Sequence, residues 1–134
     1  MILRLTGLLL LITAPALAGP RDTLPPYARC AYDQEVLHYC GLWNDGLAAG
    51  AALACAEARA ADGLDEQQAS AARITAAVAF DREWQNRSIS GKRLWCLSEG
   101  RAAALAFYDR WLQDRFKEPA GLAKETRPAD TVRE

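Results

Sequence analysis

The sequence predicts an all-α protein, a small up-down bundle of four helices stapled by two disulfides. Alanine is abundant, and the two Asp-Gly pairs, Asp45-Gly46 and Asp62-Gly63, lie in Ala- and Leu-rich helical sequence rather than between alternating strands. Four cysteines give an even number for pairing. With 134 residues, 51% of them hydrophobic and 25% charged, the chain fits one folded domain, which excludes a wholly disordered protein.

The first eighteen residues have the pattern of a secretory signal peptide. Arg4 supplies positive charge ahead of an apolar stretch from Leu5 to Ala18, which ends in the small-x-small pattern Ala-Leu-Ala. That stretch is shorter than the roughly 20 residues that a spanning helix needs. We therefore expect cleavage after Ala18 and a periplasmic or secreted chain that begins at Gly19, with no membrane span after cleavage.

The first helix is predicted from Pro26 to Tyr39, because Pro25-Pro26 suits a first helical turn. A second helix is predicted from Leu42 to Ala61, followed by Asp62-Gly63, where glycine suits the C-terminal cap.

Residues 26–61 also fit one long helix, since apolar residues continue at helical spacing through Cys40-Gly41. Against this, Gly41, Gly46 and Gly50 each cost up to about 1 kcal/mol in a helix interior relative to alanine. On a continuous helix Cys40 and Cys55 would lie about 22 Å apart, too far to bond. A hairpin that turns near residues 40–44 brings Cys30 opposite Cys55, so we favour two helices.

The third helix has the clearest start in the chain. Asp65 with Gln68 three residues later resembles a capping box, and Leu64 precedes it as a hydrophobic staple. A polar break over residues 86–91 separates it from a fourth helix, which Ser90 is expected to cap and which runs to about Phe116. The helical domain thus covers residues 19–117, and residues 118–134 are expected to be a disordered polar tail.

The four cysteines predict two disulfides rather than a metal site. There is no C-x-x-C pair, and the spacings match no zinc pattern. An exported small protein favours disulfides. In an up-down bundle Cys40 ends the first helix where Cys96 opens the fourth, so the predicted pairs are Cys30–Cys55 and Cys40–Cys96.

Charge divides the chain into two unequal halves. The formal net charge is −1, which argues against a nucleic-acid binder. Residues 22–66 are rich in acids, whereas residues 73–117 carry an excess of Lys and Arg. Two interpretations remain open, namely that the halves attract each other in the fold or that a basic face binds an acidic partner.

Enzyme and cofactor motifs are absent from the sequence. His38 is the only histidine, no serine lies in a Gly-x-Ser-x-Gly turn, and there is no P-loop, dinucleotide-binding pattern or haem attachment site. We expect no cofactor, no metal site and no catalytic residues.

The candidate binding surface lies on the fourth helix. On a helical wheel Leu94, Leu97, Leu105, Tyr108 and Leu112 share one stripe, and Trp95 falls well away from it. We expect Trp95 to anchor a partner on the outward face, surrounded by Lys92, Arg93 and Arg110. The resulting hypothesis is a non-enzymatic inhibitor, immunity or accessory protein that docks on another protein. A small cell-envelope hydrolase and a chaperone-like envelope protein are the alternatives.

Overall fold

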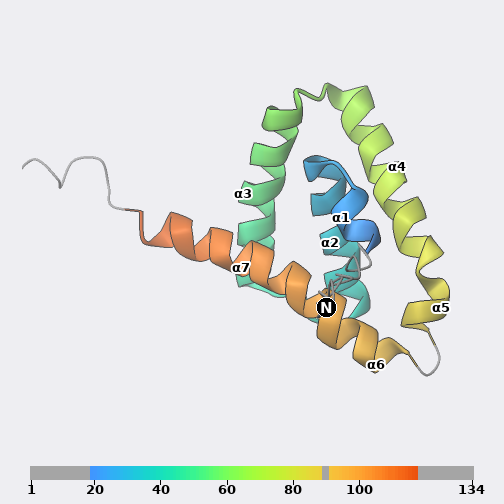
Figure 1. The fold of residues 1–134 in the computed structure, drawn as a ribbon. Coiled ribbons are helices and arrows are strands. Elements are labelled where there is room, and N and C mark those ends of the chain that lie inside the picture. The colour runs from blue at the N-terminus through green and yellow to red at the C-terminus, as the bar shows by residue number, and fades with distance from the viewer. Residues whose placement is uncertain (1–18, 89–90, 118–134) are drawn as a thin grey trace, which may run out of the picture.

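The computed structural model describes residues 19–88 and 91–117. Every regular element in these ranges is helical, which confirms the predicted all-α fold (Figure 1). The predicted signal peptide and polar tail lie outside the described residues, as does Ser90, the expected cap of the fourth helix.

Four longer helical stretches correspond to the four predicted helices. They are α2 (Pro26–Tyr39), α3 (Asp45–Asp62), α4 (Glu66–Arg82) and the last helix, which consists of α6 (Lys92–Trp95), the π-helical segment η1 (Cys96–Gly100) and α7 (Arg101–Arg115). Two single turns, α1 (Pro20–Thr23) and α5 (Trp84–Arg87), were not predicted from the sequence.

The chain reverses between α2 and α3, so residues 26–61 form two helices. Gly41 adopts a φ of 67°, a left-handed conformation that glycine tolerates best. Asn44 caps the start of α3, and its side chain accepts a hydrogen bond from the Leu47 N–H at 2.9 Å. The predicted hairpin is therefore confirmed.

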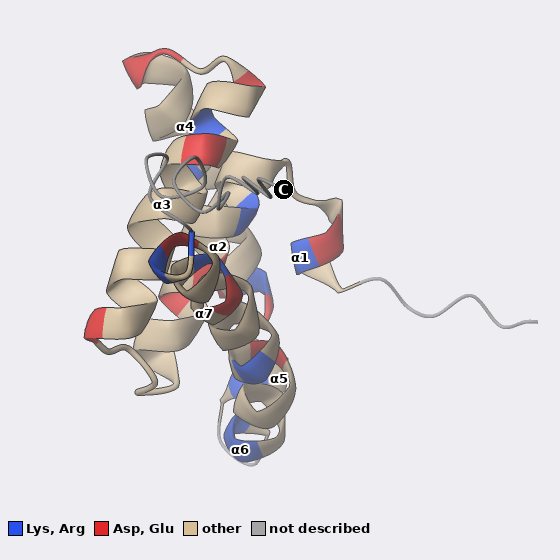
Figure 2. Ribbon diagram, turned by 90° about the vertical axis from the view of Figure 1, so that its left-hand side faces the viewer, with Lys and Arg blue, Asp and Glu red and all other residues tan. Residues whose placement is uncertain are grey.

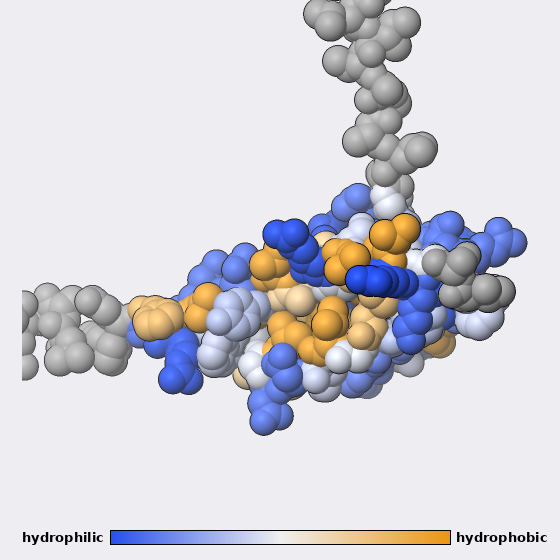
Figure 3. Space-filling view, turned by 90° about the horizontal axis from the view of Figure 1, so that it is seen from below, coloured by the Kyte–Doolittle hydropathy of each residue, from blue (hydrophilic) through white to orange (hydrophobic). Residues whose placement is uncertain are grey.

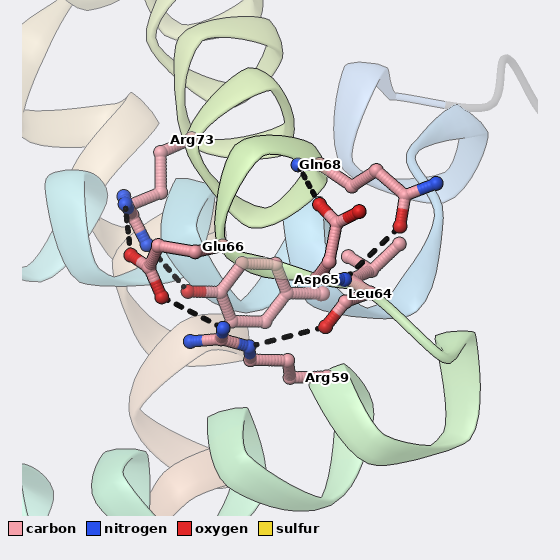
Figure 4. Close-up of polar contacts among 7 residues, drawn as sticks. Arg59, Leu64, Asp65, Glu66, Gln68 and Arg73 are labelled. Atoms are coloured by element: carbon pink, nitrogen blue, oxygen red, sulfur yellow. Dashed lines mark hydrogen bonds and ion pairs between the residues drawn. The ribbon is translucent and has the colours of Figure 1, made fainter.

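The turn between α3 and α4 also follows its sequence signals (Figure 4). Gly63 ends α3 with a φ of 63°. Asp65 and Gln68 form the predicted capping box, in which each side chain accepts a hydrogen bond from the other residue's backbone N–H. Arg59 joins the two helices across the turn by donating to the Glu66 carboxylate at 2.8 Å.

The central helix is α2, which lies between α3 and α4 and packs on both (Figure 1). Helices α3 and α4 diverge from the turn that joins them. The last helix packs across α2 and α3 at the end of the molecule away from this turn. Large core side chains come from all four stretches, namely Tyr32, Val36, Leu37, Leu47, Phe80 and Phe107.

Both predicted disulfides are present. Cys30 bonds to Cys55 and joins α2 to α3, whereas Cys40 bonds to Cys96 and joins the end of α2 to the start of η1; the Cα–Cα distance is 5.6 Å in each. The bonds close sequence separations of 25 and 56 residues. In the chain-entropy model such loops stabilise a fold by about 3–4 kcal/mol each.

Helices α3 and α7 approach each other closely at Gly50. A Cβ built on Gly50 would lie 1.9 Å from the carbonyl oxygen of Phe107. Only glycine fits there, since real Cβ atoms do not approach a backbone so closely.

In residues 19–88 and 91–117, no helix combines the length and the apolar character needed to cross a membrane.

Candidate docking surface

The last helix changes its winding at η1, where a π-helical turn replaces the α-helical one. Its most buried residues are Trp95, Gly100, Ala103 and Phe107, with spacings of five, three and four. Two residues that are five positions apart point to different faces of an α-helix. The wider π turn at η1 brings Trp95 and Gly100 back to the same face. One surface of the last helix therefore faces the core continuously.

Trp95 lies on this buried face, with only 7% of its surface exposed, so its expected place on the outward face is wrong. Its ring packs edge-on against Tyr39 and Phe80, with ring centroids 5.9 and 6.1 Å away. Its indole N–H points to the Glu83 carboxylate at 3.4 Å. Trp95 is thus a core residue and not an exposed anchor.

The cluster around Trp95 also contains a buried cation. Arg87 is 5% exposed, and its guanidinium carbon lies 4.0 Å from the ring centroid of Phe80 and 4.7 Å from that of Tyr39. The Arg87 carbonyl accepts a hydrogen bond from the Tyr39 hydroxyl. These contacts fix the end of α5 against α2 and α4.

Much of the apolar stripe found on the helical wheel is exposed. Leu94 and Leu97 are 71% and 61% exposed, and Leu105 and Tyr108 are 48% and 45% exposed. The core takes Trp95, Ala103 and Phe107 of the last helix instead, because the π turn brings these residues to one buried face. The last helix therefore carries an apolar outer surface.

Part of this outer surface borders an open groove of about 900 Å³, the α6 groove, between the last helix and the α2–α3 turn. The floor is apolar and includes the Cys40–Cys96 disulfide; it consists of Cys40, Leu42, Cys96, Leu97 and Ala104. Three basic residues complete the lining, namely Lys92, Arg93 and Arg101. Figure 3 shows the apolar patch on this side of the molecule, bordered by hydrophilic side chains.

The disulfide and Gly100 hold the α2–α3 turn against the last helix. A Cβ built on Gly100 would lie 3.0 Å from Leu42 Cδ1 and 3.4 Å from Cys40 Sγ, so any side chain there would press on the turn. The groove is thus part of a covalently fixed framework, and its shape needs no partner to form it.

The predicted cations divide between this groove and the rest of the fold. Lys92 and Arg93 line the groove, and Lys92 Nζ lies 4.7 Å from the centroid of the Tyr39 ring. Arg110 does not join them, because its guanidinium forms an ion pair with Glu57 of α3. Arg93 and Arg101 form no ion pair with any residue that the structure describes.

The acidic and basic halves of the chain form ion pairs with each other, and a basic surface also remains. Glu66 and Glu57 of the acidic half pair with Arg73 and Arg110 of the basic half. Figure 2 shows acidic residues at the α3–α4 turn and basic residues on α6, at opposite ends of the molecule. The attraction between halves therefore leaves a basic end unneutralised at the α6 groove.

Apart from the two disulfide cysteines, the sequence did not indicate four residues of this surface, namely Leu42, Leu97, Arg101 and Ala104. Leu97 was assigned to the stripe opposite Trp95, and Leu42 follows the turn glycine. The run of cations at 92, 93 and 101 on a helix end was the signal that could have indicated them.

His38 is an exposed residue of α2, and its ring stacks on Trp43 with ring centroids 4.4 Å apart. Within the described part of the chain, no three His, Cys, Asp or Glu side chains gather in a way that could hold a metal ion.

Comparison of the chain with family models, curated proteins and solved structures finds no match.

Proposed function

We propose that the protein is exported and acts without catalysis, by docking on another protein through the α6 groove. The observation that carries this proposal is the combination of an apolar floor with three cations in a preformed groove. Large exposed apolar patches mark interaction sites on soluble proteins, and Leu94 and Leu97 extend this one beyond the groove. An inhibitor, immunity or accessory role would use such a surface.

The occupant that fits best is an amphipathic helix with acidic residues beside its apolar face. Its leucine-like side chains would cover Leu42 and Leu97, and its carboxylates would meet Lys92, Arg93 and Arg101. Charge complementarity of this kind speeds association and selects against basic partners.

Export is supported by the signal-peptide pattern of residues 1–18 and by the two disulfides, which persist mainly in oxidising compartments. The periplasm or the cell exterior is accordingly the proposed location.

The test uses two synthetic helices that share an apolar leucine face and differ only in having glutamate or lysine on the other face. The acidic peptide is expected to bind about tenfold more tightly or better, and its advantage should shrink as salt is added. Fluorescence anisotropy across a salt series measures both effects.

A matched pair of variants locates the binding surface. Leu97 and Ile74 are 61% and 63% exposed, but Ile74 lies on α4, away from the groove. Leu97→Asp is expected to lower the affinity for the acidic peptide about tenfold or more, whereas Ile74→Asp should leave this affinity unchanged.

Three results would contradict the proposal. Equal affinity for both peptides would indicate unselective, chaperone-like binding. Equal losses of peptide affinity in Leu97→Asp and Ile74→Asp would show that the peptide does not bind at the α6 groove. A dimer in light scattering that Leu97→Asp dissociates, with no peptide bound, would assign the groove to a second copy of this chain.

A further inference from the structure

The described chain is held in place from its first residues onward. The Arg21 guanidinium makes two hydrogen bonds with the Asp33 carboxylate, at 2.7 and 3.0 Å, and Asp33 is only 2% exposed. Arg29 donates to the carbonyl groups of Arg21 and Leu24. These contacts fix α1 on α2, only two residues after the predicted cleavage point.

Gly19 is thereby placed beside Glu99 of η1. A Cβ built on Gly19 would lie 3.8 Å from Glu99 Oε1. By standard covalent geometry the Gly19 nitrogen lies about 2.5 Å from that point, so it is within about 6 Å of the same oxygen. Both residues line one small pocket, together with Arg21, Asp22 and Ser98.

Glu99 is a carboxyl group whose charged form an additional cation would stabilise. It is half-buried, and it forms no hydrogen bond or ion pair with the residues that the structure describes. Burial raises the pKa of the Glu99 carboxyl, and the Arg21 guanidinium only partly opposes that rise. Three further carboxylates face it and raise its pKa, namely Glu83, Asp33 and Asp22.

We propose that Glu99 is the binding site for the amino group that cleavage after Ala18 creates on Gly19. Hydrolysis of the Ala18–Gly19 peptide bond consumes one water and leaves a carboxylate on Ala18 and an ammonium on Gly19. The Gly19 nitrogen would have to move by up to about 3 Å to come within hydrogen-bond distance of Glu99 Oε1. The inference rests on the proposed export, and it makes the processed chain more stable than its precursor.

The pairing has a defined dependence on pH. An α-amino group has an ordinary pKa of about 7.7–8.0, and a carboxylate partner raises it in the folded chain. The group then binds its proton more tightly when folded. Because the pairing also needs an ionised Glu99, its contribution to stability is present between the raised pKa of the Glu99 carboxyl and about pH 7.7. It is lost as the pH rises through the raised folded-state pKa of the amino group.

The experiment compares two oxidised proteins, one that begins at Gly19 and one that keeps Ala18 in front of it. In the Gly19 chain, Glu99→Gln should lower the unfolding temperature by about 4 °C or more near pH 7. The same substitution should have no such effect near pH 10, or in the chain that keeps Ala18 and so has its ammonium one residue away. Glu35→Gln, at an exposed position of α2, is the matched control and should change neither chain.

Equal losses in both chains would show that Glu99 acts without the new amino group and would overturn the inference. So would a Glu99→Gln variant that is as stable as the parent in the Gly19 chain, or more stable. Cell fractionation with intact-mass measurement separates this failure from a failure of export. A full-length chain in the membrane fraction would contradict export, and a chain that begins at another residue would contradict the cleavage point, while the two purified chains would still report on the pairing.

Discussion

Gly50→Ala is expected to destabilise the protein by about 3 kcal/mol or more, because the new methyl group would overlap the Phe107 carbonyl. The atom it meets is backbone oxygen at 1.9 Å, so no side-chain rotation can relieve the overlap. Helices α3 and α7 would have to move apart along their whole contact. Denaturant unfolding under non-reducing conditions measures the loss.

Gly46→Ala is the matched control, since it lies four residues earlier in the same helix. A Cβ at Gly46 would meet only the Asn44 side-chain oxygen at 3.4 Å. Alanine there is expected to change stability by about 1 kcal/mol or less. If Gly50→Ala were no less stable than Gly46→Ala, the close crossing of α3 and α7 would be wrong.

Trp95→Ala is expected to cost about 3–5 kcal/mol, the range for removing a buried aromatic side chain. The loss arises because the ring fills the space between Tyr39 and Phe80, and truncation leaves a cavity there. Thermal or denaturant unfolding followed by near-UV circular dichroism measures it.

Trp84→Ala provides the comparison, because Trp84 is 58% exposed on the neighbouring turn α5. We expect that variant to lose no more than about 1 kcal/mol. A Trp95→Ala protein with an unchanged midpoint and an impaired peptide affinity would restore Trp95 as a surface anchor and contradict its place in the core.

The helix ends were predictable because their signals lie in neighbouring residues. The disulfides were predictable because the order and direction of the helices decide which cysteines can meet. Pro26 begins α2, and the capping box of Asp65 and Gln68 begins α4, as the sequence indicates. The pairing of the cysteines followed from chain reversal alone, since a hairpin near residue 42 places Cys30 opposite Cys55.

The outer face of the last helix was not predictable from a uniform wheel. The wheel advances 100° per residue, whereas the π turn at η1 shifts the phase between Trp95 and Ala103. The wheel therefore placed Trp95 on the outward face of the last helix, whereas its side chain lies on the buried face. Hydrophobicity also favoured the leucines of the stripe as core residues, although the core takes Trp95, Ala103 and Phe107 instead.

Glycines illustrate the same distinction between local and tertiary causes. Gly41, Gly46 and Gly50 together predicted a break in the helix, yet only Gly41 has a positive φ. The reason for Gly50 is a contact with Phe107, 57 residues later, which no local pattern contains. The position of α1 is likewise tertiary, since it depends on the pairing of Arg21 with the buried Asp33.

Charge reversal of the α6 groove tests the proposed docking surface most directly. In the triple variant Lys92→Glu, Arg93→Glu and Arg101→Glu the apolar floor is unchanged, but its cations become anions. Each of these residues is exposed, so the fold should remain intact by circular dichroism. The measurement is the ratio of affinities for the acidic and basic amphipathic peptides. We predict that this ratio inverts, with the variant preferring the basic peptide about tenfold, whereas an unchanged ratio in a folded variant would contradict docking at the α6 groove.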